Sequence, residues 1–521
     1  MKMNNIMQTT YLKSPEIKVL THENNQQISF EKFINKFKST LKTVFHEEND
    51  IDTMGITRGI SPKVLGQIMD TNPLSLSIPT EYGGRGGKVQ ENLQLLSAAS
   101  YESLSLSLTL GINSALFLQP FTKYGQNAAK PAVFSRFLNN QNMGGLMITE
   151  PGYGSDALNM QTSFTENSNH FHLKGTKHWA GLTGQADYWL LTARKLTEQG
   201  ALQRDIDFFV CDNTNSQQNI VVEERFENLG LYQIPYGRNI LDVKIPKVQR
   251  LVPQTNGIQM MLDLLHRSRL HFPGMGLGFV KRMLDEAIAH CQQRLVGGRN
   301  LFSYDQVQQH LARLQANFTI ISAFSKHSSG IAGIENDLTG LGLEANIIKT
   351  VTTDLMQESS QTLLTLVGAK GYKLNHIAGR GTVDSRPFMI FEGSNDILYA
   401  QIGEAIIKLM KTVKENAFQV YLKSHRLTEL AAIYVKDLIS FDIDLQMPQR
   451  KLVELGRVVS RVASMDMVLK LGDAGFRNDL VESAVSMLRQ EITTLVSHFA
   501  YQQPTKVVED YESGGLWFNL A

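Results

Sequence analysis

The pattern of apolar and polar positions divides the chain into three blocks: helical, then strand-like, then helical again. Apolar side chains recur every three or four positions over residues 28–45, which predicts an amphipathic helix of about five turns. Helical segments follow to about residue 140, and helical periodicity returns after residue 257. The later segments have apolar faces over 277–291, 307–321, 343–355, 451–471 and 481–499.

Short apolar or alternating runs, separated by turn-rich segments, fill the middle block. Their sequences are HFHL, YWLLTA, DIDFFV, NIVVEE and NILDVKI, and no helix of ten residues separates them. This pattern predicts an antiparallel sheet or barrel rather than βαβ units. The predicted fold is mainly α with a central β domain, divided into a flexible lead at 1–27, a helical domain at 28–145, the β domain at 146–255, a helical bundle at 256–409 and an additional helical region at 410–521.

A glycine-rich loop opens the middle block. The apolar run LMI at 146–148 leads through Thr149 into EPGYGSD at 150–156. Such a turn at a strand end presents backbone amides and small side chains to a ligand. Trp179 follows on the same small β unit, where we expect it to be buried.

Composition narrows the class of protein. With 51 basic and 50 acidic residues the net charge is +1, so nucleic acid is not an expected partner. The two cysteines, Cys211 and Cys291, form neither a disulfide framework nor a CxxC pair, which suits a reducing cytoplasm. No secretory signal or run of roughly 18 consecutive apolar residues is present, so we expect a soluble protein without a transmembrane segment. No metal site is predicted.

Two glycine-rich segments resemble phosphate-binding motifs only superficially. TEYGGRGG at 80–87 would need glycine in place of Tyr82, and no Ser or Thr follows Lys88. GMGLG at 274–278 lacks both a preceding strand and the third glycine of a dinucleotide fingerprint. Close packing of helices at small residues is the favoured interpretation of the second segment.

Four stretches in order resemble the acyl-CoA dehydrogenase family of flavoproteins. ITEPGYGSD opens the middle block, and RLHFPGMGLGFVKRMLDEAIAHCQQRLVGGRNL at 269–301 is similar to the family helix that ends in Arg-x-x-Phe-Gly. LVGAKGYKLN at 366–375 looks like the family's GGxGY turn, and DSRPFMIFEGSNDI at 384–397 looks like its IYEGT element. The resemblance covers residues 28–409 and implies an N-terminal helical domain, a middle β-barrel and a C-terminal four-helix bundle. The region after residue 409 is similar in size to the added helical domain of very-long-chain members.

The resemblance implies FAD-dependent dehydrogenation of an acyl thioester, such as an acyl-CoA, to the trans-2-enoyl thioester. Glu392 matches the family's base, which takes the α proton while a hydride passes to flavin N5. The apolar residues 388–391 precede Glu392, and a dry setting raises the pKa of a carboxylate and strengthens it as a base. From the residues alone, a helix cap or a salt bridge would be the favoured role for this glutamate.

The family's other site residues are carried over by position. Arg294 matches the arginine that holds the FAD pyrophosphate across a subunit interface, although a solvated helix-end arginine is the alternative. Trp179 is either a flavin contact or plain core. Ser155, Arg269 and Gly393 match substrate contacts. The cofactor contacts implied by the resemblance are Met147, Ile148, Thr149, Trp179, Ala180, Gly181, Arg294, Asp305, Thr365, Gly368, Ala369, Ser394 and Asp396.

Several positions depart from the family pattern. Gly181 stands where the family has a hydroxyl close to flavin N5, so that hydrogen bond is lost, or Thr183 or a water supplies it. Tyr153 adds bulk near the acyl channel. The remaining departures, which bear on flavin affinity, are Gly297, Asp305, Thr365 and Val383.

The resemblance also implies partners, and two rival functions stay open. An electron-transferring flavoprotein or similar carrier is the expected electron acceptor, and a homodimer is expected in preference to a tetramer. Gly181 motivates a flavin oxidase or monooxygenase on the same fold. The missing family side chains motivate a non-catalytic scaffold that binds thioesters or partner proteins.

Overall fold

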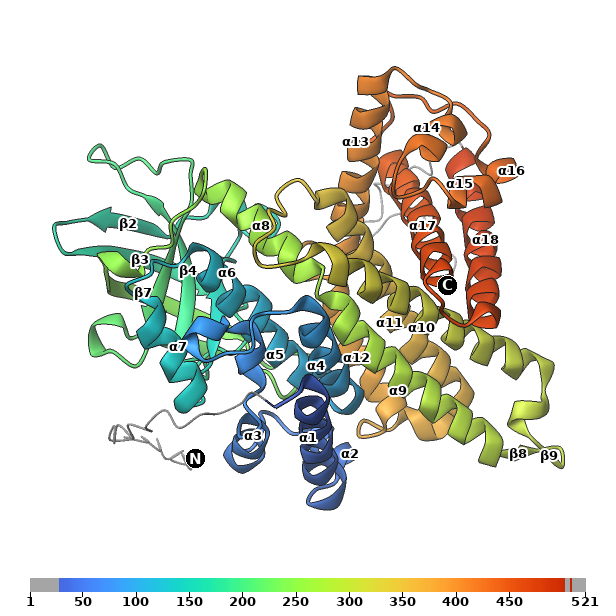
Figure 1. The fold of residues 1–521 in the computed structure, drawn as a ribbon, viewed down its shortest axis with the longest axis horizontal. Coiled ribbons are helices and arrows are strands. Elements are labelled where there is room, and N and C mark those ends of the chain that lie inside the picture. Colours follow the sequence, from blue (N-terminus) through green and yellow to red (C-terminus); the bar gives the residue numbers. More distant parts are fainter. Residues whose placement is uncertain (1–27, 502–506, 508–521) are drawn as a thin grey trace, which may run out of the picture.

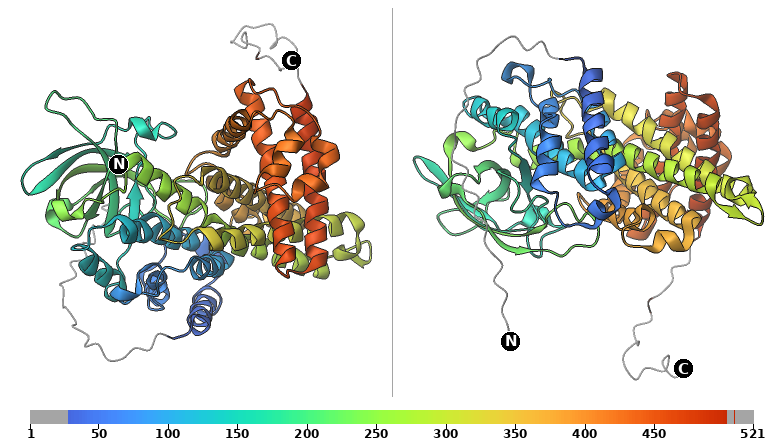
Figure 2. Two further views of the ribbon diagram at one scale, coloured as in Figure 1. Left: turned by 45° about the horizontal axis from the view of Figure 1, so that its top comes forward. Right: turned by 90° about the horizontal axis from the view of Figure 1, so that it is seen from below.

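The computed structural model describes residues 28–501 and residue 507, so the predicted lead at 1–27 lies outside the described part. A β-sheet forms one end of the molecule, long helices cross its middle, and the last helices form a separate layer away from the sheet (Figures 1 and 2). Buried apolar side chains from Phe33 to Ile492 form one contiguous cluster that joins all three parts.

The N-terminal part is helical, as predicted. Ser29 caps α1, whose buried face carries Phe33, Ile34, Phe37 and Leu41, and a π-helical turn at Thr43–Glu47 completes the expected amphipathic segment. The helices of this part are α1 (Phe30–Lys42), α2 (Ile51–Ile56), α3 (Pro62–Met69), α4 (Val89–Glu102), α5 (Leu104–Gly111), α6 (Gln119–Tyr124) and α7 (Lys130–Asn139).

A continuous helical stretch in this part is long and apolar. Residues Leu104–Tyr124, which comprise α5, a π-helical segment at Ile112–Leu118 and α6, pass the length and composition test for a membrane span. However, 94% of the apolar window is buried inside the fold, as in a core helix.

The middle block forms a seven-stranded sheet with the order β1-β4-β2-β3-β7-β6, and β5 pairs with β4. The pairs β2–β3, β3–β7, β6–β7 and β4–β5 are antiparallel as predicted, but β1–β4 and β2–β4 are parallel, so the sheet is mixed rather than antiparallel throughout. After β1 the chain passes through the glycine-rich loop into β2, which runs in the same direction as β1. The chain then reverses twice, once between β2 and β3 and once between β3 and β4, so β4 also runs in the direction of β1. The strands are β1 (Gly144–Met147), β2 (Ser163–Glu166), β3 (His170–His178), β4 (Tyr188–Lys195), β5 (Asp207–Asp212), β6 (Val221–Arg225) and β7 (Gly237–Pro246).

The bundle that follows packs against α4 at two glycines of the GMGLG segment. A Cβ built on Gly274 would lie 2.9 Å from the Leu93 carbonyl oxygen, and one on Gly278 would lie 1.9 Å from that of Ser97. Close helix packing is thus confirmed for this segment. The bundle comprises α8 (Gly257–Arg269), α9 (Phe272–Gln293), a hairpin of β8 (Leu295–Val296) and β9 (Arg299–Asn300), α10 (Asp305–Ile331), α11 (Gly342–Val367), α12 (Ile377–Ser385) and α13 (Asn395–Val413).

The remaining helices form what we call the tail, residues 414–501. Two long helices dominate it, close to the predicted segments at 451–471 and 481–499, and they lie along α13 and α10 (Figure 1). The tail helices are α14 (Phe418–Ser424), α15 (Ala431–Tyr434), α16 (Lys436–Ile439), α17 (Gln449–Asp473) and α18 (Asn478–Ala500).

Candidate active site

A cavity of about 470 Å³ lies between the sheet, α8 and the turn that precedes α13. The C-terminal ends of β1 and β3 form one wall, and the turn that carries Glu392 forms the opposite wall. Apolar side chains supply most of the remaining lining, among them Leu108, Ile112, Leu116, Ile258, Met261, Leu262 and Leu265. A concave, mainly apolar space with a few polar groups is the usual form of a small-molecule site.

Nine of the residues proposed from the sequence line this cavity. They come from four separate stretches of the chain, and the fold brings them together. They are Ile148, Thr149, Ser155, Trp179, Ala180, Gly181, Arg269, Glu392 and Gly393.

The turn that carries Glu392 has a strained backbone. Glu392 has φ +56° and Gly393 has φ +94°, both in the left-handed region, which is unfavourable for a glutamate. Arg269 holds this conformation, because its Nε and one terminal nitrogen donate to the Glu392 carbonyl oxygen at 3.1 and 2.7 Å. The other terminal nitrogen donates to Asn346 Oδ1 at 2.7 Å. Arg269 therefore supports the turn through the backbone.

The two carboxylate oxygens of Glu392 have different surroundings. Ser268 Oγ donates to Oε1 at 2.7 Å, whereas Oε2 is buried and has no hydrogen-bond partner among the described residues. Burial raises the pKa of Glu392 above its ordinary value, and the Ser268 hydrogen bond and the charges of Arg269 and Lys349 offset part of that rise. An unpaired oxygen on a carboxylate of raised pKa is suited to accept a proton from a ligand in the cavity.

Lys349, which was not proposed from the sequence, also supports the turn that carries Glu392. Its side chain is buried, and Nζ donates to the Gly393 carbonyl oxygen at 2.9 Å and to Asn395 Oδ1 at 2.9 Å. Burial lowers the pKa of Lys349 to about 7. A lone lysine among the apolar residues of α11 was the signal that could have drawn attention to it, and Ser268, next to the proposed Arg269, was missed as well.

Trp179 forms the opposite wall and is not core. Its side chain is 52% exposed and its φ is +57°, so both the expectation of a buried tryptophan and the plain-core alternative are wrong. The Trp179 N–H donates to the Gly237 carbonyl oxygen at 3.0 Å, and the ring lies against Phe226 with centroids 4.5 Å apart. These contacts hold a large aromatic face at the edge of the cavity.

Behind this wall, Lys177 fixes the end of β1. Its fully buried Nζ donates to the Ile148 carbonyl oxygen at 3.1 Å, to Glu150 Oε1 at 2.8 Å and to Thr192 Oγ1 at 3.0 Å. Burial lowers the pKa of Lys177 to about 8, while Glu150 favours its charged form. The ion pair thereby anchors the start of the glycine-rich loop.

At Gly181 a side chain would meet the end of the Ile112 side chain, which would have to move aside. A Cβ built there would lie 2.8 Å from Ile112 Cδ1. Thr183 does not replace the absent hydroxyl, because its buried Oγ1 donates to the Ala180 carbonyl oxygen at 2.7 Å and the residue does not line the cavity. The suggestion that Thr183 supplies the missing hydrogen bond is therefore wrong.

The other proposed residues lie outside the cavity. Met147 is buried behind the wall, Ser394 precedes α13, and the exposed Asp396 forms an ion pair with Arg457 of the tail at 2.9 Å. The remaining proposed residues are all exposed. They lie in segments at the end of the bundle where the β8–β9 hairpin projects, which is the end opposite the sheet (Figure 1): Arg294, Asp305, Thr365, Gly368 and Ala369.

These exposed residues belong to two neighbouring segments. Burial lowers the pKa of His290 on α9, and the nearby charges of Lys370 and Arg294 lower it further. The end of α9 and the turn at 366–370 therefore lie side by side, at a distance from the cavity of the same chain.

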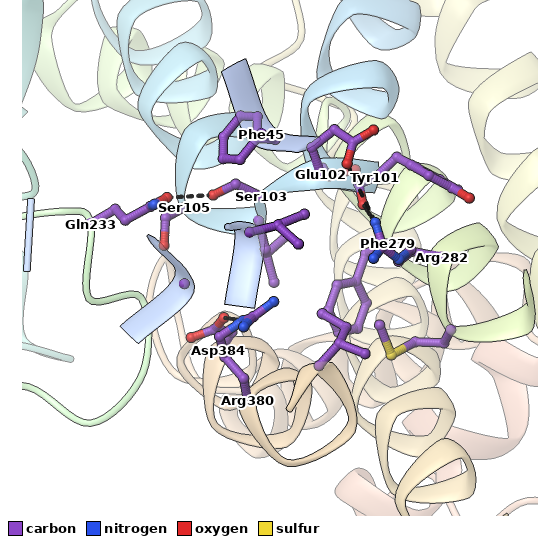
Figure 3. Close-up of a pocket in the computed structure, with 16 residues that line it drawn as sticks. Phe45, Tyr101, Glu102, Ser103, Ser105, Gln233, Phe279, Arg282, Arg380 and Asp384 are labelled. Carbon is purple, nitrogen blue, oxygen red and sulfur yellow. Dashed lines mark hydrogen bonds and ion pairs between the residues drawn. The ribbon is translucent and has the colours of Figure 1, made fainter. Parts of the chain in front are cut away.

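A second, much smaller pocket lies where α12 meets the α4–α5 junction (Figure 3). Its volume is about 20 Å³, and its mixed lining includes two ion pairs, with Arg282 3.3 Å from Glu102 and Arg380 4.0 Å from Asp384. Such a space holds about one water molecule, so it is not a substrate site. Among residues 28–501 and 507, no group of three or more His, Cys, Asp or Glu side chains is arranged to hold a metal ion.

Comparison with known proteins gives matches over most of the chain. Three family models match: "Acyl-CoA dehydrogenase, N-terminal domain" over residues 35–141, "middle domain" over 145–243 and "C-terminal domain" over 255–407. A glutaryl-CoA dehydrogenase of Desulfococcus multivorans is 26% identical over 323 residues, which are 61% of this chain and 82% of the relative. A mitochondrial very long-chain specific acyl-CoA dehydrogenase of Rattus norvegicus is 23% identical over 372 residues, 70% of this chain but only 56% of the relative.

A solved structure resembles the whole architecture, including the tail. The acyl-CoA dehydrogenase complexed with FAD from Bacillus anthracis superposes with a TM-score of 0.72 at 16% identity, covering 92% of this chain and 88% of the other. The predicted order of helical domain, β domain, helical bundle and additional helices is confirmed.

Proposed function

Because the chain belongs to the acyl-CoA dehydrogenase family of oxidoreductases, we propose that it uses FAD to dehydrogenate an acyl thioester to the trans-2-enoyl thioester. One observation carries the proposal above the others. The Glu392 carboxylate has a raised pKa and a buried, unpaired oxygen, and its residue lines a cavity large enough for a ligand.

The residues of the cavity fit a flavin. Trp179 presents a half-exposed aromatic ring at one wall, and Thr149 and Ala180 line the same wall. Flat rings stack on such aromatic faces. We propose that the residues at this wall hold the isoalloxazine ring. When bound, FAD supplies the acceptor for the hydride that leaves the β carbon.

The residues of the opposite wall perform the proton transfer. Glu392 removes the α proton through Oε2, while Ser268 keeps its hydrogen bond to Oε1 and so holds the carboxylate in one orientation. Arg269 and Lys349 hold the backbone of the turn and stabilise the charged carboxylate before the reaction. The apolar lining excludes water, which would otherwise compete for the carboxylate.

The cavity favours an uncharged acyl group. Arg269 is the only arginine or lysine among the lining residues, and its guanidinium is committed to the Glu392 carbonyl oxygen and to Asn346. The two lining histidines, His178 and His266, have their pKa lowered mainly by burial, which disfavours the charged form that would pair with a terminal carboxylate. We infer a hydrocarbon acyl chain that lies against Leu108, Ile112 and Leu116.

Assembly and electron acceptor follow from the same proposal. Arg294 is exposed and lies away from the cavity of its own chain, which fits a homodimer in which it meets the neighbour's FAD pyrophosphate. A guanidinium suits that role because it is permanently charged and can donate two parallel hydrogen bonds to a phosphate. We propose an electron-transferring flavoprotein or a similar carrier as acceptor. A cytoplasmic location and the domain boundaries stay predictions from the sequence.

Anaerobic titration of the purified, FAD-loaded protein with a panel of acyl-CoAs tests the function. We expect bleaching of the flavin absorbance with saturated acyl-CoAs and none with Glu392→Gln, which keeps the shape of the side chain and should still bind FAD. Wild-type protein that stays yellow with every acyl-CoA would refute the dehydrogenase and favour a non-catalytic scaffold. Unchanged bleaching in the variant would refute the role of Glu392 alone.

A flavin oxidase is the second candidate, and Gly181 is the observation that favours it. No hydroxyl stands there, and Ile112 occupies the adjoining space. Oxygen consumption during aerobic turnover distinguishes the two functions. Turnover with oxygen as fast as turnover with an artificial electron carrier would identify an oxidase.

A further inference from the structure

The tail packs against α13 at unusually short range. A Cβ built on Gly456 of α17 would lie 2.0 Å from the Tyr399 carbonyl oxygen, and one on Gly403 of α13 would lie 2.3 Å from the Leu452 carbonyl oxygen. Each helix thus contributes a glycine where the backbone of the other passes. Because α13 begins directly after the turn that carries Glu392, the tail is attached to the helix that continues this turn.

Arg461 of α17 is the centre of an ion cluster at this contact. Its Nε donates to Glu491 Oε2 at 2.7 Å, and its terminal nitrogens donate to Tyr399 Oη at 3.2 Å and to Asp354 Oδ2 at 3.3 Å. The arginine side chain is 12% exposed, so these bonds are shielded from water. Glu491 also pairs with Arg313 of α10, which gives the cluster a second attachment to the bundle.

The cluster continues without interruption to the active-site turn. Asp354 Oδ1 accepts from Asn395 Nδ2 at 2.7 Å, and Asn395 Oδ1 accepts from Lys349 Nζ at 2.9 Å. Lys349 then donates to the carbonyl oxygen of Gly393, the residue after Glu392, at 2.9 Å. Tyr399 Oη forms a second link between Arg461 and Asp354, because it accepts from Arg461 and donates to Asp354 Oδ2 at 2.6 Å.

We propose that the tail is part of the active-site architecture, with Arg461 as a positioning residue that acts through Asp354, Asn395 and Lys349 on the turn bearing Glu392. The inference deepens the proposed function, since it rests on Glu392 being the base. It assigns to the tail a role beyond that of an added helical layer.

The physical reason lies in the charge of Asp354. With Arg461 present, a cation neutralises Oδ2 while Oδ1 orients Asn395. Without it, Asp354 keeps the hydrogen bonds from the uncharged donors Tyr399 and Asn395, and the buried Lys349 is a cation whose charge already interacts with that of Asp354. Lys349 would then be drawn away from the Gly393 carbonyl oxygen, which would leave the left-handed turn less well held.

Hydrogen exchange of the full-length protein tests this without relying on catalysis. We expect Arg461→Met to speed exchange of the amides in residues 388–398 by about two- to thirty-fold, the range for coupling through such networks. Arg461→Lys keeps a charge but cannot reach three acceptors, so its effect should be intermediate. Arg477→Met is the matched control, because this tail arginine forms only an exposed pair with Asp479.

Unchanged exchange at 388–398 in Arg461→Met, with faster exchange only in the tail, would overturn the proposal. If Arg461→Met unfolds the tail, the Lys variant decides by the same comparison. In FAD-loaded protein the Met variant should also bleach about two- to thirty-fold more slowly with an acyl-CoA, with little change in the concentration needed for half-maximal rate. Wild-type protein that does not bleach would refute the proposed function, whereas the exchange result would still decide the role of the tail.

Discussion

The environment of Glu392 is set by a few side chains, and Ser268 has the most direct influence on its carboxylate. Burial raises the pKa of Glu392, and the hydrogen bond from Ser268 is the largest contribution that lowers it. The base works only when deprotonated, so the rate should fall as pH decreases through the pKa of Glu392. We expect Ser268→Ala to move this acid limb of the bleaching rate to higher pH, since the hydrogen bond from Ser268 stabilises the charged carboxylate and lowers its pKa.

The pH profile needs a control of the same chemistry. Ser322→Ala serves, because its hydroxyl donates only to the Phe318 carbonyl oxygen of its own helix. An acid limb that does not move in Ser268→Ala would mean that Glu392 does not control the rate.

The protonation of Asp384 makes the free energy of unfolding depend on pH. Burial raises its pKa to about 6, although the Leu231 N–H donates to it at 2.6 Å and Arg380 lies 4.0 Å away. Below about pH 4 both the folded and unfolded states hold the proton, whereas between about pH 4 and 6 only the folded state does. Stability from this group therefore falls as pH rises through that window.

Asp384→Asn removes this dependence. We expect the free energy of unfolding of the variant, relative to wild type, to rise on the order of 2–3 kcal/mol between pH 4 and 7 in denaturant titrations. Asp473→Asn changes an exposed aspartate and should give a nearly flat difference over the same range. A flat difference for Asp384→Asn too would show that Arg380 already neutralises the buried charge.

At the residue scale, the sequence predicted the two walls of the cavity but not what holds them. Glu392 was identified through the resemblance of its segment to the family's IYEGT element, since its apolar neighbours and the following glycine alone would have favoured a structural role. Trp179 was expected to be buried, because a tryptophan in a strand-like run usually is, and its exposure depends on the left-handed turn that ends β3. Lys349 was missed because its hydrogen-bond acceptors lie 44 and 46 residues away in the sequence.

Among the secondary-structure elements, the contact of α13 with α17 is the most sensitive to size. We expect Gly456→Ala to destabilise the tail by about 1–3 kcal/mol, because the added methyl would meet the Tyr399 carbonyl oxygen. Thermal and denaturant unfolding measure the change. Gly330→Ala in α10 is the control, since a Cβ there meets nothing within 4 Å, and it should be neutral or slightly stabilising. Equal stability of both variants would contradict the close packing.

The helices were predicted more accurately than the sheet. Helical periodicity is a local property, so the long segments α9, α10, α11, α17 and α18 followed from the sequence. Strand partners are not local. The short β2 was not predicted, and the parallel pairing of β1 with β4 depends on where the intervening hairpin lies.

For the whole molecule, the end opposite the sheet is where a second copy is expected to bind. The hairpin and the neighbouring turn expose large apolar side chains there, with Tyr372 88% exposed, Leu295 65% and Leu374 61%. Exposed apolar groups of this size usually mark an interface. Arg294, proposed to meet the neighbour's cofactor, lies in the same region.

Tyr372→Asp should therefore convert a dimer to a monomer and release FAD, because the charge would be desolvated at the interface and the neighbour's arginine would be lost from the cofactor site. Light scattering measures the mass, and the flavin absorbance that remains after gel filtration measures FAD. Tyr434→Asp changes a tyrosine of the tail that is 54% exposed, and it should leave both unchanged. A wild-type protein that is monomeric yet keeps FAD would refute the shared site, and Arg294 would then be a solvated residue at the end of α9.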